Sequence, residues 1–175
     1  TTIDFYLTVT SIFVPLTFGA SIVVYEESEK GPDLAIFDVI KDNQADIIKL
    51  TPSHLGLLKE HDLKSSRIRT MIVGGEDLKR DLAESISKSF QHEIAIYNEY
   101  GPTEATVGCI VHRYDSFNDL SKSVPIGKPI ANMQAYILDE NLNPVPQGVL
   151  GKLYVSGDGL SLGYWNDKEL TEQKF

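Results

Sequence analysis

Strand-like and helix-like patterns of apolar residues alternate along the first 112 positions of the chain. The strand-like runs are short and apolar, and they lie at residues 21–25, 46–50, 69–73 and 93–97. The helix-like stretches carry apolar residues three and four positions apart, and they lie at residues 7–16, 32–43, 54–61 and 78–90. This alternation predicts an α/β fold with a mostly parallel sheet and covering helices.

The pattern changes after residue 112. Residues 115–123 are polar and loop-like, and beyond Pro125 only short strand patterns follow, at residues 134–139 and 151–156. We therefore expect two parts. The first is an α/β subdomain over residues 1–112, and the second is a partial, small, barrel-like antiparallel β unit over residues 113–175.

Two of the expected strands end in residues that are suited to a ligand. In a mostly parallel sheet the carboxyl ends of neighbouring strands open on one crevice, where ligands collect. At the first end, Gly74 and Gly75 permit close approach of a flat ligand because they carry no Cβ. At the second, Tyr100 offers an aromatic face on which a base can stack. A strand-to-helix turn is the alternative interpretation of the two glycines.

Thr103 and Glu104 follow the second strand end, after Gly101 and Pro102 have stopped the strand. They project a hydroxyl and a carboxylate from a tight turn, a combination suited to holding a metal-bound phosphate. Taken alone, the same turn could equally be a solvated loop.

The amino-acid composition argues against several classes of binding partner. Sixteen basic residues against twenty-five acidic ones give a net charge of −9, which disfavours nonspecific binding to nucleic acid or to anionic membranes. The single Cys109 and four scattered histidines provide neither a disulfide framework nor zinc-ligand spacing. Neither a signal peptide nor a membrane span is visible, so a reducing cytoplasm is the expected location.

Three motifs, in order, resemble those of one enzyme family. Residues 98–104 read Asn-Glu-Tyr-Gly-Pro-Thr-Glu, residues 151–165 run from Gly151 to Trp165, and residues 5–21 end in Gly-Ala-Ser. Together they are similar to the motifs of amino-acid-activating adenylation domains of nonribosomal peptide synthetases, which belong to the adenylate-forming, AMP-binding enzymes. The resemblance spans almost the whole chain.

The resemblance implies a reaction and a set of binding residues. In this family a carboxylate attacks the α-phosphate of ATP to give an acyl-adenylate and pyrophosphate, and the acyl group then passes to a thiol on the phosphopantetheine arm of a carrier protein. By resemblance, Thr103 approaches the α-phosphate and Glu104 binds Mg²⁺. The residues implied to border adenine and ribose are Gly74, Gly75, Glu76, Asn98, Glu99, Tyr100 and Gly101.

The resemblance also implies a pocket that selects the amino acid. Its positions fall on Tyr6, Leu7, Thr10, Lys49, Ile72, Gly74, Glu99, Val107 and Gly108, and from Leu7 onward they are similar to an asparagine-selecting pattern. The chemistry agrees, because a buried lysine needs a partner and Glu99 would supply it. Lys49 and Glu99 would offer a donor for an amide carbonyl and an acceptor for an amide NH₂. A surface lysine at a strand end is the alternative.

Tyr6 departs from the family pattern, which has an aspartate there to bind the substrate's α-ammonium. A neutral phenol cannot make that charge-assisted bond. The substrate could therefore lack a free α-amine, as an α-keto or α-hydroxy acid does, or the domain could be degenerate, or Asp4 could serve instead. Asp4 would point to the same face only if the segment were extended.

The resemblance covers the middle of an adenylation domain. In the family, a phosphate loop lies before the position of Thr1, and an aspartate that holds the ribose and a small domain with a catalytic lysine lie beyond the position of Phe175. We therefore expect these residues alone to be inactive and to need the rest of the domain as a partner. A noncatalytic structural platform is the competing interpretation, although the intact Thr103 and Glu104 favour an enzyme. Within the last motif, Tyr164 and Trp165 are expected to be packing residues.

Overall fold

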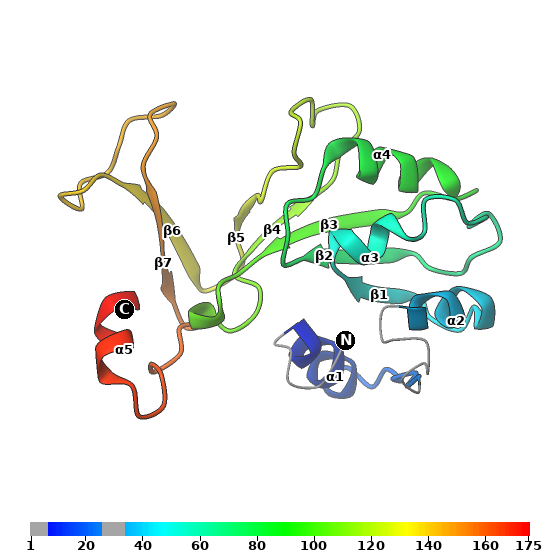
Figure 1. Cartoon of the computed structure of the whole chain (residues 1–175), viewed down its shortest axis with the longest axis horizontal. Helices are drawn as coiled ribbons and strands as arrows, with labels where there is room; N and C mark the ends of the chain where they lie inside the picture. Colours follow the sequence, from blue (N-terminus) through cyan, green and yellow to red (C-terminus); the bar gives the residue numbers. More distant parts are fainter. Residues whose placement is uncertain (1–6, 26–33) are drawn as a thin grey trace.

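The computed structural model describes residues 7–25 and 34–175. In this part of the chain a five-stranded sheet has the order β1-β2-β3-β4-β5 (Figure 1). Its strands are β1 (Ile47–Leu50), β2 (Thr70–Gly74), β3 (Ala95–Tyr100), β4 (Ile110–Arg113) and β5 (Lys128–Pro129). Strands β1, β2 and β3 are parallel, whereas β4 and β5 join antiparallel. The expected α/β fold with a mostly parallel sheet is confirmed.

Helices cover both faces of this sheet. They are α1 (Leu7–Thr17), α2 (Ala35–Asp42), α3 (Pro52–Gly56) and α4 (Arg80–Ser89). Figure 1 shows α3 and α4 on one face, and α1 below the sheet on the other. Thr51 caps α3 because its hydroxyl accepts from the backbone N–H of His54, and Pro52 follows at the first helical position.

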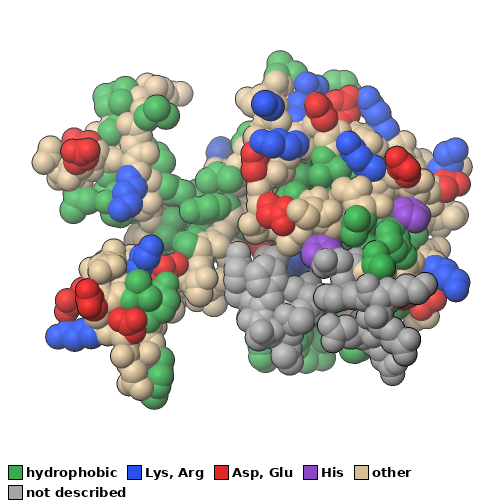
Figure 2. All heavy atoms as spheres, viewed as in Figure 1, with side chains coloured by type: hydrophobic (Ala, Val, Ile, Leu, Met, Phe, Trp, Pro, Cys, Tyr) green, Lys and Arg blue, Asp and Glu red, His purple; other side chains and the backbone are tan. Residues whose placement is uncertain are grey.

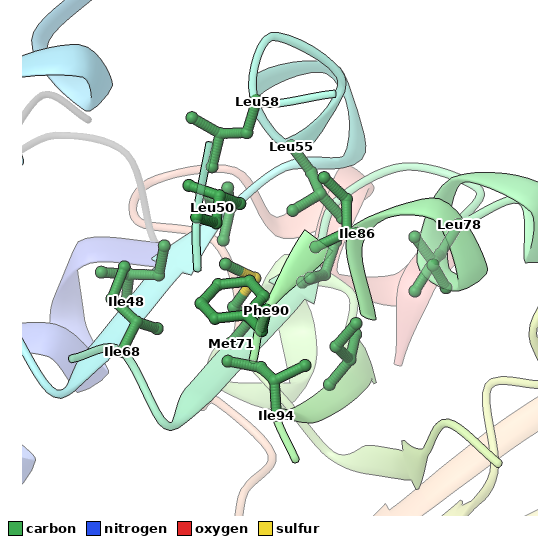
Figure 3. Packing of buried hydrophobic residues seen from close by; sticks show 14 of the residues in the cluster. Ile48, Leu50, Leu55, Leu58, Ile68, Met71, Leu78, Ile86, Phe90 and Ile94 are labelled. Atoms are coloured by element: carbon green, nitrogen blue, oxygen red, sulfur yellow. The ribbon is translucent and has the colours of Figure 1, made fainter. Parts of the chain in front are cut away.

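The strands divide their side chains between the two faces with a period of two. Ile48, Met71, Val73 and Ile96 are buried and point to the face covered by α3 and α4. There they form one hydrophobic cluster with Leu55, Leu58, Ile86 and Phe90 (Figure 3). The alternate positions of the strands therefore face α1.

A second unit follows the sheet. Strands β6 (Met133–Leu138) and β7 (Lys152–Gly157) form an antiparallel pair, and α5 (Lys168–Lys174) follows them (Figure 1). Met133 packs with Ala105, Cys109 and Ile110 in a small cluster that joins this unit to the sheet. Hydrophobic side chains are exposed on the unit, as Figure 2 shows; they include Tyr136, Ile137, Val149 and Leu150.

Some expectations from the pattern were wrong. Residues 21–25 form no strand in the structure, and Val24 is 85 % exposed, because none of the described strands lies beside them to complete a hydrogen-bonded ladder. The helix expected over 54–61 ends at Gly56 and continues as turns. Trp165 was expected to pack, yet it is 92 % exposed.

The helix expected to begin at Leu78 starts at Arg80 instead. Leu78 and Lys79 pair with the 123–124 loop, where the backbone N–H of Val124 donates to the carbonyl of Leu78. These long-range bonds compete with the first helical turn and are not visible in a local pattern. The start of the helix expected at residue 32 lies outside the described residues. Within the described ranges, no helix is both long enough and apolar enough to cross a membrane.

Candidate active site

A charged pair lies on the face of the sheet that α1 covers. Lys49 Nζ is 2.5 Å from Glu99 Oε2, and the two side chains are only 5 % and 17 % exposed. The same ammonium donates to Thr10 Oγ1 of α1 at 2.7 Å. The structure therefore brings together three residues that the sequence assigned to the substrate pocket, and Lys49 is not a surface lysine.

Glycines leave the space that Glu99 occupies. A Cβ at Gly108 would lie 2.4 Å from Glu99 Cδ, and one at Gly74 would lie 2.7 Å from the carbonyl oxygen of Glu99. Ile72 lies two residues before Gly74 on β2 and so shares its face. The pocket positions on β1, β2 and β3 and Gly108 therefore lie around one carboxylate.

The chain between the 3-10 helix η2 (Thr103–Ala105) and β4 is strained. Thr106 has a φ of 47° and Val107 a φ of 74°, which are left-handed values that a β-branched residue rarely adopts. Val107 is buried, and a Cβ at Gly101 would lie 1.7 Å from its carbonyl oxygen. This close contact carries the chain from η2 past Glu99. Strain held in place by packing is typical of functional sites.

A cavity of about 380 Å³ opens at the carboxyl ends of β2 and β3. Tyr100 stands at its edge and is 37 % exposed. The lining residues are Gly75, Glu76, Asp77, Asn98, Glu99, Tyr100, Gly101, Val124 and Ile126. Six of these belong to the set expected to border adenine and ribose, so the structure brings the two strand ends together around one cavity.

Hydrogen bonds fix the walls of this cavity. Asn98 is 4 % exposed, and its amide nitrogen donates to the carbonyls of Val124 and Pro125 at 3.0 Å each. Glu76 Oε2 accepts from Ser53 Oγ at 2.5 Å and from the Ser53 backbone N–H at 3.1 Å. Asn98 therefore anchors the loop that forms one wall, and Ser53 at the start of α3 holds the carboxylate of the other.

Asp77 ties the same loop to the end of β2. Its carboxylate forms an ion pair with Lys79 and accepts from Ser123 Oγ at 3.1 Å. The hydrogen bonds from Lys79 and Ser123 hold the pKa of the Asp77 carboxyl below its usual value. Asp77 is therefore ionised at neutral pH and adds negative charge to the cavity.

Thr103 and Glu104 lie in η2, directly after the strand end that lines the cavity. The Tyr164 hydroxyl donates to Glu104 Oε1 at 2.6 Å. This bond, helped by the backbone N–H of Glu104 and by Lys174, holds the pKa of the Glu104 carboxyl below its usual value. The same bond raises the pKa of Tyr164, because it stabilises the protonated phenol.

Comparison with known proteins identifies the family of the chain. The sequence profile described as AMP-binding enzyme matches residues 2–165. The chain belongs to the AMP-binding enzyme family. Its sequence is 55 % identical to bacitracin synthase 3 of Bacillus licheniformis and 51 % identical to tyrocidine synthase 3 of Brevibacillus parabrevis. Each match covers 99 % of the chain. The chain spans only 3 % of the length of each.

Solved structures agree with this family. The AMPPNP-bound form of the nonribosomal peptide synthetase FmoA3 superposes with a TM-score of 0.88 at 30 % identity, over 100 % of the chain and 19 % of that protein. A four-domain nonribosomal peptide synthetase bound to AMP and glycine superposes with a TM-score of 0.84 at 30 % identity, over 100 % and 13 %. The resemblance read from the three motifs is thus confirmed.

The donor set of this AMP-binding enzyme fits magnesium held by one carboxylate. Among the described residues, no three His, Cys, Asp or Glu side chains lie together as a metal cage. Mg²⁺ usually takes only one or two protein carboxylates, with waters and substrate phosphates completing its octahedron. Glu104 is a carboxylate of this kind, and its lowered pKa extends its ionised range further into acid.

The expected pocket residue Tyr6 and its alternative Asp4 lie outside the described residues. Leu7 is the first residue of α1, one helical turn before Thr10. The structure adds contacts that the motifs did not predict. Asp77, Val124 and Ile126 line the cavity, and Ser53 binds the carboxylate of Glu76 in its wall. Tyr164, expected only to pack, binds the carboxylate of Glu104 in η2. The sequence signal for the loop is the apolar Val124-Pro125-Ile126 step within a polar stretch.

Proposed function

We propose that this chain is the substrate-selecting and nucleotide-binding core of an amino-acid adenylation domain in a nonribosomal peptide synthetase. In the proposed reaction, a carboxylate oxygen of the substrate attacks the α-phosphorus of ATP. The bond from that phosphorus to the bridging oxygen of pyrophosphate breaks, and the products are an acyl-adenylate and pyrophosphate. The observation that carries the proposal is the buried pair of Lys49 and Glu99 beside a cavity at the strand ends.

The cavity is the proposed nucleotide site. Its glycines, Gly75 and Gly101, permit close approach of a flat ring, and Tyr100 offers a partly exposed aromatic face. Thr103 begins η2, directly after the β3 end that lines the cavity, and is proposed to approach the α-phosphate. One of the similar solved structures is an AMPPNP-bound form, which supports nucleotide binding by this chain.

Glu104 is the proposed protein ligand of Mg²⁺. A bound Mg²⁺ would neutralise phosphate charge. The chain's own contribution is an ionised carboxylate, held in place by the Tyr164 hydroxyl at 2.6 Å and kept charged by its lowered pKa. Glu104 thus offers magnesium a fixed anionic oxygen at the end of β3.

The substrate side chain is proposed to bind between Lys49 and Glu99. The ammonium has three donors, and its contacts to Glu99 and Thr10 use two of them. The third could donate to the carbonyl of an asparagine side chain, and the Glu99 carboxylate could accept from its NH₂ group. An acid with an aliphatic side chain would leave this buried charged pair without those bonds, so the pocket favours a side-chain amide.

Tyr6 supports a second candidate substrate class. A phenol in place of the aspartate that binds the α-ammonium removes a charge-assisted bond, which favours an α-keto or α-hydroxy acid. A degenerate domain that serves as an interaction platform is the third possibility. These alternatives differ in which acid, if any, supports exchange.

The proposed partners follow from the same family. One similar solved protein contains adenylation and PCP domains, and its TM-score is 0.85 at 26 % identity. We accordingly propose that a carrier-protein thiol accepts the acyl group. We also propose the division into residues 1–112 and 113–175 as the two functional subdomains.

These 175 residues alone should bind nucleotide without catalysing its reaction. None of the residues that line the cavity is Lys or Arg, while Glu76, Asp77 and Glu99 are acidic. The cavity therefore lacks cations to neutralise the charge that develops on the phosphates. The expected partner is the remainder of an adenylation domain.

The experiment has two parts. The first part measures ATP binding to the chain by calorimetry in the presence of Mg²⁺. The second uses a chimera in which residues 1–175 replace the matching segment of bacitracin synthase 3. Exchange of labelled pyrophosphate into ATP is measured with this chimera. Asparagine-dependent exchange is the expected result, and a Tyr6→Asp variant should exchange faster. If exchange depends only on an α-keto or α-hydroxy acid, the substrate belongs to that class and not to the amino acids. No exchange with any acid would overturn the enzymatic proposal in favour of a platform.

A further inference from the structure

One segment holds Glu104 at two points. The Tyr164 hydroxyl donates to the carboxylate oxygen Oε1 at 2.6 Å, and the backbone N–H of Ser161 donates to the main-chain carbonyl of Glu104 at 2.8 Å. Tyr164 is 60 residues from Glu104 in sequence and belongs to the stretch that follows β7. The segment after β7 thus holds Glu104, just beyond the end of β3, by two hydrogen bonds.

Tyr164 is itself fixed from α5. Its backbone N–H donates to Thr171 Oγ1 at 2.9 Å, and its ring lies edge-on to Phe175 with centroids 6.4 Å apart. Gly163 has a φ of 128°, and a Cβ there would lie 2.6 Å from Thr171 Cγ2. The turn before Tyr164 therefore needs a glycine, and the phenol cannot move far without disturbing α5.

The contact leaves the carboxylate able to bind a cation. A carboxylate has two oxygens and about four lone-pair positions, and the phenol and the backbone N–H of Glu104 occupy two of them. A hydrogen bond to a metal-binding carboxylate fixes its orientation, and loss of such an outer contact typically lowers metal affinity about 10- to 100-fold. Tyr164 has the geometry of such an outer contact.

We propose that Tyr164 is a positioning residue that orients the Glu104 carboxylate for the Mg²⁺ of the bound nucleotide. This inference rests on the proposed function, because Mg²⁺ with ATP is its ligand. It assigns a role to the segment after β7, whose contacts with η2 hold the proposed metal ligand. Tyr164 does not touch the reacting atoms and acts only through Glu104.

Calorimetry on the full chain separates this role from a merely structural one. ATP affinity is measured with Mn²⁺ as a tighter-binding substitute for Mg²⁺, and again without metal in a chelator, for the wild type and for Tyr164→Phe. The variant should bind the Mn²⁺ complex of ATP about 10-fold more weakly and metal-free ATP equally well. Tyr136→Phe, on an exposed tyrosine of β6, should match the wild type in both.

A Glu104→Gln background provides the decisive comparison. If Tyr164 acts through Glu104, adding Tyr164→Phe to this background should change the metal-dependent affinity no further. Equal loss of metal-dependent and metal-free affinity in Tyr164→Phe would overturn the inference, because it would show a general effect on folding. Wild-type affinity in the variant would overturn it too. If the wild type binds ATP neither with Mn²⁺ nor without metal, the proposed function is overturned, and the inference with it.

Discussion

Lys49 and Glu99 form their ion pair across an intervening strand. They lie on β1 and β3, which β2 separates, so their strands are about 9.5 Å apart, and Glu99 lies two residues beyond Tyr97, the β3 residue in register with Lys49. The long lysine side chain crosses this distance because β2 presents Gly74, without a side chain, beside Glu99. The pair therefore depends on a gap in the sheet face, and it places both charges under α1.

Replacing Lys49 with Met should destabilise the chain by about 2–4 kcal/mol, because it leaves Glu99 as a mostly buried carboxylate without its cation. The free energy of unfolding is measured by urea denaturation. The matched control is Lys49→Met with Glu99→Leu, which removes both charges. This double variant should recover most of the loss. If it is as unstable as the single variant, packing of the lysine stem rather than charge pairing dominates at this position.

Replacing Gly108 with Ala should damage the proposed substrate pocket. The added methyl would lie 2.4 Å from Glu99 Cδ, so the carboxylate must move and its contact to Lys49 must lengthen. In the bacitracin synthase 3 chimera we expect the KM for asparagine to rise about 10-fold or more, since an interaction of about 1.4 kcal/mol or more is lost. Gly56→Ala is the control, because a Cβ there meets nothing within 4 Å. An unchanged KM in Gly108→Ala would contradict the assignment of Glu99 to the substrate.

The sequence predicted those features that local periodicity and charge burial control. The short apolar run at residues 69–73 predicted strand β2, and the period of two in a strand then places Ile72 and Gly74 on the same face. The resemblance assigned Lys49 and Glu99 to one pocket, and the cost of burying an ammonium without a partner predicted that the two would pair. The first conclusion needs only the side-chain period, whereas the second also needed the family motifs.

Contacts between distant segments could not be predicted in this way. Asn98 lines the cavity, and its amide nitrogen also holds the loop at Val124 and Pro125, a contact that the motif did not predict. The bond from Tyr164 to Glu104 joins two motifs that were read separately. Helix α5 was not expected at all, because its short polar run carries no strong apolar period.

The stabilising effect of Asp77 should depend on pH. Its folded-state pKa is lowered by Lys79 and Ser123, so its contribution is fully present above the unfolded pKa of about 3.9 and is lost as pH falls through the folded value. At pH 7 the melting temperature of Asp77→Asn should be lower than that of the wild type. The two melting temperatures should converge as the pH falls below the lowered folded-state pKa of Asp77. Asp81→Asn, on the exposed side of α4, serves as the control, and a pH-independent difference for Asp77→Asn would show that charge is not the cause.

Removing the Ser53 hydroxyl should weaken nucleotide binding. Glu76 lines the cavity, and Ser53 Oγ holds its carboxylate at 2.5 Å while the backbone N–H of the same residue adds a longer bond of 3.1 Å. In Ser53→Ala only the longer bond remains, so Glu76 gains freedom to extend into the cavity and to place a mobile negative charge where phosphates are proposed to bind. Loss of an exposed hydrogen bond to a carboxylate costs about 1 kcal/mol, so calorimetry should show ATP binding about 5-fold more weakly. Ser53→Thr keeps the hydroxyl and should restore the affinity, and Ser65→Ala, at an exposed position, should not change it. If Ser53→Ala lowers the melting temperature but leaves the affinity for ATP unchanged, the hydroxyl acts only as part of the α3 start, and Glu76 does not border the nucleotide.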